Sequence, residues 1–204
     1  MADKKSTDTV IAQSNPRGIP AAPFIDNVSD YVSSRADVEP TLQRFQEMIS
    51  KYQFMELNTQ RRAQGLREKI PDIKKTLEVV RFLKLQKDAS SSTLETSFEL
   101  NDTLYARAQI SPSDTDEVYL WLGANVMLAY PIAEAETMLQ DKLSAAEQSL
   151  ANCDEDLEFL REQITTIEVA TARVYNWDVV QRRKEKAEGK GDDDDHTEKR
   201  KPGG

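Results

Sequence analysis

The stretch TLETSFELNDTLYARAQISPSDTDEVYLWLGANVMLAYPIA, residues 93–133, decides the fold of this chain. Hydrophobic side chains recur in it at every second position, which is the period of a β-strand. On either side of it, hydrophobic residues follow the heptad spacing of long helices instead. The stretch therefore predicts β-structure between two helices. The expected strands are 94–100, 104–110, 118–122 and 126–130.

Short turns connect these strands into two hairpins. Asn101-Asp102 tolerates positive φ angles and suits a two-residue turn, and Gly123-Ala124-Asn125 joins the second pair. Tyr119, Trp121 and Met127 give the second hairpin a second hydrophobic face, which two strands cannot bury by themselves. We therefore expect other chains to cover the hairpins. The predicted assembly residues are Phe98, Leu100, Leu104, Leu120, Trp121, Leu122, Val126 and Leu128.

Two heptad segments of similar length flank the hairpins. Ten of the thirteen a and d positions from Leu42 to Lys84 are hydrophobic, and a second seam runs from Ile132 to Gln181. We expect helices over 40–88 and 131–183, paired so that Leu42 lies opposite Val174. The predicted fold class is mainly α with a small β part: a long antiparallel two-helix coiled coil whose helices are joined by two β-hairpins.

Two prolines bear on the helix bounds. Pro71 lies inside the first heptad segment, where proline removes a backbone donor and usually kinks a helix. Because the seam continues on both sides of it, we expect a bend over residues 64–70 rather than an end. Pro131 is expected to start the second helix.

The charges beside the seam fit an antiparallel pair. Basic side chains occupy e or g positions of the first helix, and acidic side chains occupy those positions of the second. Opposite charges at these positions set partner and orientation. In the expected register Arg67 faces Glu147, and Arg62 faces Asp156.

The composition is typical of long, solvated helices. Only 38% of the residues are hydrophobic and 31% are charged, which is a poor balance for a compact globule. The net charge of −9 argues against nucleic acid as a partner, and a single cysteine fits a reducing compartment. The first residues lack the hydrophobic core of a signal peptide, and the longest uncharged run, 118–133, is too short to cross a bilayer. We expect a soluble, cytosolic protein without a membrane partner.

No pattern predicts catalysis, a cofactor or a metal site, so we expect no enzyme. The single histidine, His196, falls in the tail 184–204, which we expect to be disordered, as we do residues 1–16. Four aspartates precede it, and a solvated charge run explains them better than a loose cation site. Cys153 falls on the helical seam as a small core residue. Arg182-Arg183-Lys184 resembles a nuclear-import patch, which would add a nuclear pool, although a solvated helix end also explains it.

One end of the helix pair carries more hydrophobic side chains than a seam can cover. Met48 and Met55 occupy g positions, and Tyr175 and Trp177 lie close together on the second helix. Exposed methionines and aromatics suit the binding of many apolar partners, because methionine repacks easily. Alternatively, residues 18–31, whose prolines favour an extended chain, fold back and cover this end. The predicted binding tip is Phe45, Met48, Tyr52, Met55, Val174, Tyr175 and Trp177.

Several stretches resemble α-class subunits of eukaryotic prefoldin. The order helix, two hairpins, helix is similar to that of the family, and the resemblance covers about residues 16–183. The stretches that carry it are RGIPAAPFI (17–25), FQEMISKYQFME (45–56), LNDTLYARA (100–108), WLGANVMLAYP (121–131) and LEFLREQITTIEVATARVYNWD (157–178).

The resemblance implies a subunit of a hexamer that contains two α-class and four β-class prefoldin subunits. The hairpins would assemble into a β-barrel platform, and the coiled-coil tips would hold non-native actin and tubulin and pass them to the cytosolic chaperonin without ATP. The hairpin residues would then be the assembly site and the predicted tip the client site. The alternative function is a structural coiled-coil adaptor, which would bridge fixed partners through a defined docking surface.

Overall fold

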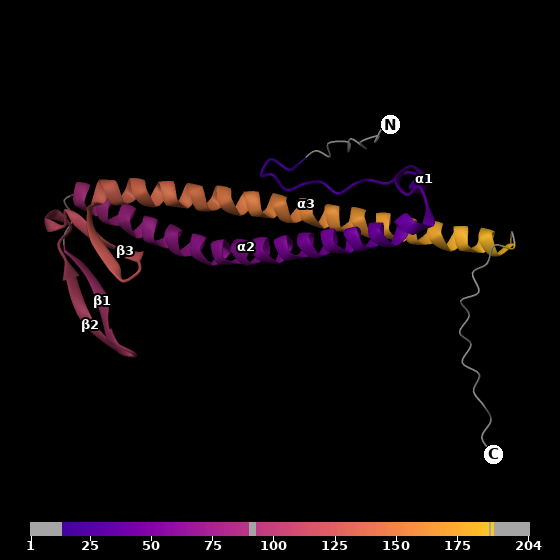
Figure 1. Ribbon diagram of the computed structural model, residues 1–204. Helices are drawn as coiled ribbons and strands as arrows, with labels where there is room; N and C mark the ends of the chain where they lie inside the picture. The colour runs from indigo at the N-terminus through magenta and orange to yellow at the C-terminus, as the bar shows by residue number, and fades with distance from the viewer. Residues whose placement is uncertain (1–13, 90–92, 188, 190–204) are drawn as a thin grey trace, which may run out of the picture. The chain divides into compact units, whose positions relative to one another are not determined.

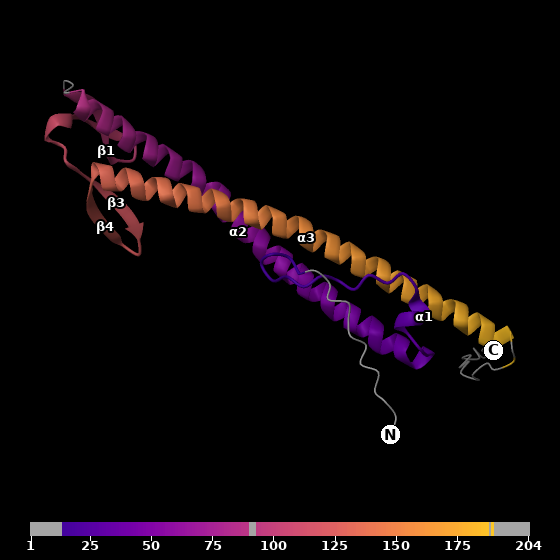
Figure 2. The ribbon, with the colours of Figure 1, turned by 90° about the horizontal axis from the view of Figure 1, so that it is seen from above.

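The computed structural model of the chain describes residues 14–89, 93–187 and 189 (Figures 1 and 2). Two long helices flank two small antiparallel sheets of two strands each, which confirms the predicted fold class. Among the described residues, no helix is both long enough and hydrophobic enough to cross a membrane. In chain order the elements are α1 (Val28–Tyr31), η1 (Arg35–Asp37), α2 (Val38–Asp88), β1 (Leu94–Asn101), β2 (Leu104–Ile110), η2 (Pro112–Asp114), β3 (Glu117–Gly123), β4 (Val126–Pro131) and α3 (Ile132–Ala187).

The helix bounds follow the heptads closely. α2 begins two residues earlier than expected and continues through Pro71, as the unbroken seam predicted; the bend stays a prediction. Just before α2, the Asp37 carboxylate accepts the backbone N–H of Ser34 at 3.0 Å, in a capping box. Pro131 is the last residue of β4 rather than the first of the helix, and α3 ends four residues beyond the expected 183.

The chain divides into two compact units, and both long helices contribute to each. One unit comprises residues 1–57 and 156–204, and the other comprises residues 58–155. The second unit holds the hairpins and a core in which hydrophobic residues of α2, β3 and α3 meet. The buried members of that core are Ile70, Leu77, Val80, Leu120, Ile132, Ala135, Leu139 and Leu143.

The two hairpins differ in how well their turns were predicted. β1 and β2 turn at Asp102-Thr103, one residue later than expected, because a bulge near the end of β1 brings Asn101 into the ladder opposite Leu104. Thr103 takes the positive φ of 68°, and the Asn101 side chain accepts the N–H of Asp102 instead. β3 and β4 turn at Ala124-Asn125, with φ angles of 48° and 60°, inside the predicted three-residue connection.

Two charge pairs and one hydrogen bond of the second unit share one geometry, in which e positions of α2 reach e positions of α3. The charge pairs are Arg67 with Asp154 at 2.6 Å and Lys74 with Glu147 at 2.7 Å, and Arg81 donates to the amide oxygen of Gln140 at 2.6 Å. The expectation that complementary e positions lie together is confirmed for these pairs.

The expected partners of Arg67 and Arg62 are wrong. Every Cα–Cβ bond of a helix leans toward the N-terminus of that helix. In an antiparallel pair, the side chains of Arg67 and Asp154 therefore lean toward each other. Glu147 lies one heptad away on α3, its side chain leans away from Arg67, and it pairs with Lys74 instead. Arg62 donates to the Ser149 hydroxyl at 3.0 Å. Asp156 accepts from Arg17 instead, at 2.6 Å.

A polar pair interrupts the hydrophobic seam near its β-sheet end. The heptad count from Ile132 places Glu136 on the seam, but Ala135 is the fully buried residue there. The Glu136 carboxylate pairs with Lys84 at 2.7 Å and with Arg81 at 3.1 Å. These two cations, Lys84 first, lower the pKa of Glu136, and Glu136 in turn raises the pKa of Lys84.

Charge reversal tests the Arg67–Asp154 pair. Arg67→Glu or Asp154→Arg alone should destabilise the helix pair, and the double variant should recover most of the loss. Because both side chains are about half exposed, we expect a coupling of about 0.2–1 kcal/mol that weakens with salt. Denaturant unfolding of the four proteins at low and high salt measures it. The matched cycle of Arg67 with Glu147 should show no coupling, and a larger coupling there would contradict the register.

The Glu136 cluster predicts a pH dependence. Because the folded-state pKa of Glu136 lies below its unfolded value, about 4.3, its contribution is present above that value and is lost as the pH falls through the folded pKa. Glu136→Gln should therefore lower the midpoint of thermal unfolding at pH 7, and the difference from wild type should shrink below about pH 4.3. Asp141→Asn is the control on the exposed surface of α3. A difference that persists at low pH would contradict this assignment.

Candidate functional site

The first unit is organised around an N-terminal strap, which we define as residues 14–37. Between Gly18 and Ile25 the strap has no helix or strand, and Figures 1 and 2 both show it alongside the long helices. Arg17 and Ile25 are eight residues apart, or about 26 Å of extended chain. The residues that receive them, Asp156 and Arg173, are 17 residues apart on α3, also about 26 Å. The strap therefore runs nearly fully extended, in the same direction as α3.

Charged side chains fix both ends of the strap. At its start, Asn15 and Arg17 both donate to the Asp156 carboxylate at 2.6 Å. At its other end, Arg35 pairs with Asp178 at 3.2 Å and also with Glu185. Hydrogen bonds from Arg35, first to Glu185 and then to Asp178, raise the pKa of the Arg35 guanidinium.

Between these ends, three helix side chains bind the backbone of the strap. The Gln163 amide oxygen accepts the N–H of Ala22 at 2.8 Å. The Tyr52 hydroxyl donates to the carbonyl of Pro20 at 3.0 Å, and burial raises the pKa of that hydroxyl. The Arg173 guanidinium donates to the carbonyl of Ile25. Three polar backbone groups of this extended segment are thus satisfied without a partner strand.

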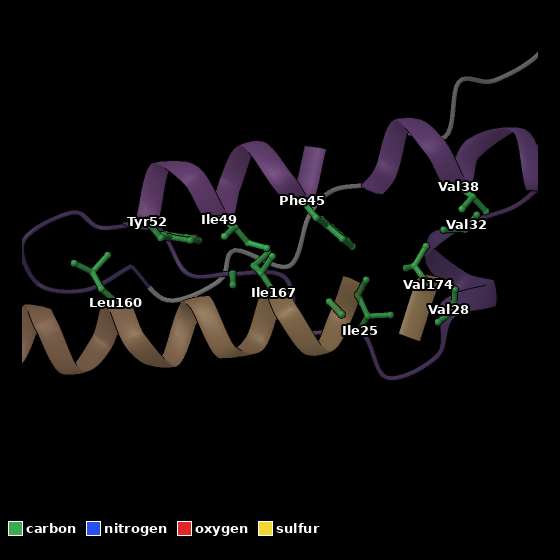
Figure 3. Close-up of a cluster of buried hydrophobic side chains, with 12 residues drawn as sticks. Ile25, Val28, Val32, Val38, Phe45, Ile49, Tyr52, Leu160, Ile167 and Val174 are labelled. Carbon is green, nitrogen blue, oxygen red and sulfur yellow. The ribbon is translucent and has the colours of Figure 1, made fainter. Parts of the chain in front are cut away.

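Hydrophobic side chains of the strap pack against side chains of both helices, and we call the helix surface beneath them the groove. Figure 3 shows Ile25, Val28 and Val32 directed at side chains of α2 and α3. Ala22 joins them, while Ile19 is half-buried at the edge. The helix residues of this core are Val38, Phe45, Ile49 and Tyr52 from α2, and Leu160, Ile167, Ala170 and Val174 from α3.

The exposed tip expected from the sequence is wrong for its central residues. Phe45 and Val174 are fully buried and Tyr52 is 2% exposed, because the strap covers them. The alternative, in which residues 18–31 fold back, is what the structure has. Met48, Met55 and Trp177 are half-buried at the edge of the core, and only Tyr175 is well exposed, at 58%.

The polar residues that receive the strap were not predicted in that role. Asp156 was expected to face Arg62 and Asp178 fell on the helical seam, while Gln163 and Arg173 look like ordinary solvated positions of a charged helix. The strap partners of all four lie more than 130 residues away in sequence. Gln163 and Asp178 are nevertheless buried. The strap itself also begins earlier than expected, because Asn15, assigned to the disordered N-terminus, is described and buried.

Hydrophobic side chains also remain open in the first unit. Phe24 is 70% exposed, with the Arg173 guanidinium 5.7 Å from its ring centre. Phe54 on α2 is 67% exposed, and Leu57 is partly exposed. Together with Tyr175, these residues give the first unit solvent-facing hydrophobic surface even with the strap in place.

The hairpins of the second unit expose most of the predicted assembly residues. Their outward side chains include tyrosines and a methionine as well as aliphatic residues. Leu120 is the exception, because it alternates with Tyr119 and Trp121 along β3 and so points into the chain's own core. The exposed members are Phe98, Leu100, Leu104, Trp121, Leu122, Val126 and Leu128, with Tyr105, Tyr119 and Met127 beside them.

The described residues contain no group of three or more His, Cys, Asp and Glu side chains that could hold a metal ion. Cys153 is a buried free thiol, in line with the predicted small core residue. His196 and the four aspartates before it lie outside the described residues, as do residues 1–13 of the predicted disordered N-terminus.

Comparison with known proteins gives the family. The protein-family model described as "Prefoldin subunit" matches residues 52–177. Prefoldin subunit 3 of Elsinoe fawcettii is 70% identical over 87% of this chain and 88% of that protein. The probable prefoldin subunit 3 of Schizosaccharomyces pombe is 51% identical over 86% of this chain and 99% of that protein, and human prefoldin subunit 3 is 45% identical over 82% and 85%. The chain belongs to the prefoldin family, and each of the three relatives named above is a prefoldin subunit 3.

Proposed function

We propose that this chain joins other prefoldin subunits, in a hexamer of two α-class and four β-class subunits, through its hairpins. Its helix ends then help to hold non-native polypeptides, actin and tubulin among them, for transfer to the cytosolic chaperonin without ATP. The chain acts in the cytosol, with a nuclear pool as a second location. Membership of the prefoldin family supports the assembly, and the observation that carries it is the open hydrophobic surface of the hairpins.

The hairpin surface requires a partner for physical reasons. Tyr119 is 70% exposed, Phe98 is 61% exposed and Trp121 is 60% exposed, all on small two-stranded sheets. On the second sheet Tyr119 and Trp121 lie on one face, with Met127 paired to Trp121. Exposed hydrophobic clusters of this kind mark interaction sites on soluble proteins. Two-stranded sheets are also marginally stable in water unless something packs on them. Neighbouring subunits that supply further strands and side chains would meet both needs.

Charges on the hairpin faces test the assembly. Trp121→Asp together with Leu128→Asp would bury two carboxylates in a hydrophobic platform, and that burial is costly. We expect this variant to fail to co-purify with the other prefoldin subunits while its helices still form. Ser97→Asp with Asn125→Asp adds the same charge at polar positions of the hairpins and serves as the control. Normal co-purification of the first variant would overturn the assembly role of these faces.

The first unit supports polypeptide holding through its hydrophobic surface. Non-native proteins expose hydrophobic segments of no fixed sequence, and burial of apolar area attracts them at about 25 cal/mol per Å². Phe54 and Tyr175 present open rings, and Met48, Met55 and Trp177 add half-buried side chains. Several weak sites in one complex act together through effective concentration, so each can bind loosely and still release its client.

Removal of the exposed rings tests this role. Phe54→Ser with Tyr175→Ser should leave folding and assembly unchanged, because both side chains face solvent. Reconstituted hexamers that carry the variant should hold unfolded actin about two- to fivefold more weakly, without losing it, since other subunits also contribute. Suppression of actin aggregation measures the effect. The control is Gln53→Ser with Asn176→Ser, at exposed polar neighbours. Unchanged suppression would place the client surface elsewhere.

A further inference from the structure

The strap occupies its groove in the way that a bound peptide would. It is extended, it presents small and hydrophobic side chains to the groove, and three helix side chains bind its backbone. Contacts to backbone N–H and C=O groups do not depend on the sequence of the bound segment. The groove therefore has the chemistry to hold an extended hydrophobic segment of many different sequences.

The strap is also separate from the backbone hydrogen bonds of the two long helices. Among the described residues, no backbone–backbone hydrogen bond joins it to α2 or α3. Ionic anchors hold its two ends: the side chains of Arg17 and Arg35 are about one-third exposed, and those of their partners Asp156 and Asp178 are 15% and 6% exposed. Salt screens such pairs in part, because one charge of each pair still faces solvent. The strap can thus leave the groove without breaking either long helix.

We infer that the groove beneath the strap is a binding site for extended hydrophobic segments of non-native polypeptides, and that the strap is its resident competitor. This inference rests on the proposed holding function. A client segment would take the place of residues 19–25, offering its own backbone N–H and C=O groups to Gln163, Tyr52 and Arg173. Strap closure would then shield Phe45 and Val174 between clients, which limits self-association through the open groove.

Competition predicts a measurable change in affinity. The apparent affinity of a site is reduced by the fraction of molecules in which the site is closed. Any change that loosens the strap without altering the groove should therefore tighten client binding. Arg17→Gln with Arg35→Gln does this, because it removes both ionic anchors and leaves every hydrophobic side chain in place.

The experiment uses hexamers reconstituted with the other prefoldin subunits. The probe is fluorescently labelled, reduced and carboxymethylated α-lactalbumin, which stays unfolded, and binding is followed by anisotropy. We expect the R17Q/R35Q hexamer to bind about three- to tenfold more tightly than wild type. R44Q/R183Q, which makes the same change in net charge at exposed arginines outside the strap, should match wild type. Circular dichroism and co-purification confirm that each variant is folded and assembled.

Two further measurements keep the result unambiguous. A peptide of residues 14–37 added in trans should displace the probe from the R17Q/R35Q hexamer, and Gln163→Leu in that background should weaken both the probe and the peptide. If wild-type and R17Q/R35Q hexamers bind the probe equally and the peptide does not compete, the strap is a fixed brace and the inference is overturned. If neither the wild-type nor the R17Q/R35Q hexamer holds the probe, the proposed holding function fails, and the inference fails with it.

Discussion

Two paired helices bury side chains only along the seam between them, and a sheet of two strands buries none by itself. This chain carries more hydrophobic side chains than that, so something else must cover the rest. The two units of the chain solve this problem differently. In the first unit, an extended segment of the same chain covers the excess over Phe45, Tyr52 and Val174. In the second, one face of β3 packs on the helices through Leu120, while Trp121 and its neighbours stay open. The open surface is the part that a protein partner must cover.

The sequence predicted well which side of each helix or strand is buried. It predicted less well which residues lie opposite each other along the paired elements, and both outcomes have one physical reason. A period of 3.5 or 2 residues says which side of an element is buried, but any shift by a whole period leaves the pattern unchanged. Arg67 accordingly meets Asp154, one heptad from the expected Glu147, because side-chain lean decides between equivalent positions. The first hairpin turn moved by one residue because a bulge is a local feature that alternation does not encode.

The strap shows a different limit of sequence analysis. Its own hydrophobic residues are visible in the sequence, and they suggested that residues 18–31 cover something. The partners that decide the matter include Gln163 and Arg173, single polar side chains on a helix full of polar side chains. Periodicity cannot single them out, since their role arises only when a segment far away in sequence is placed beside them. Whether a hydrophobic end is open or covered is therefore decided by tertiary contacts.

The contacts of the strap also explain how the groove can be covered by the strap and still be available to a competing segment. A purely hydrophobic cover would be held by area alone, and it would be displaced only by a larger hydrophobic area. Here part of the binding comes from side-chain bonds to backbone groups, which every polypeptide possesses, and part comes from ionic anchors at the two ends of the strap. A competing segment can reproduce the first contribution whatever its sequence, but not the second. The ionic anchors at the two ends therefore set the balance between strap and competitor, while the groove between them accepts hydrophobic segments of many sequences.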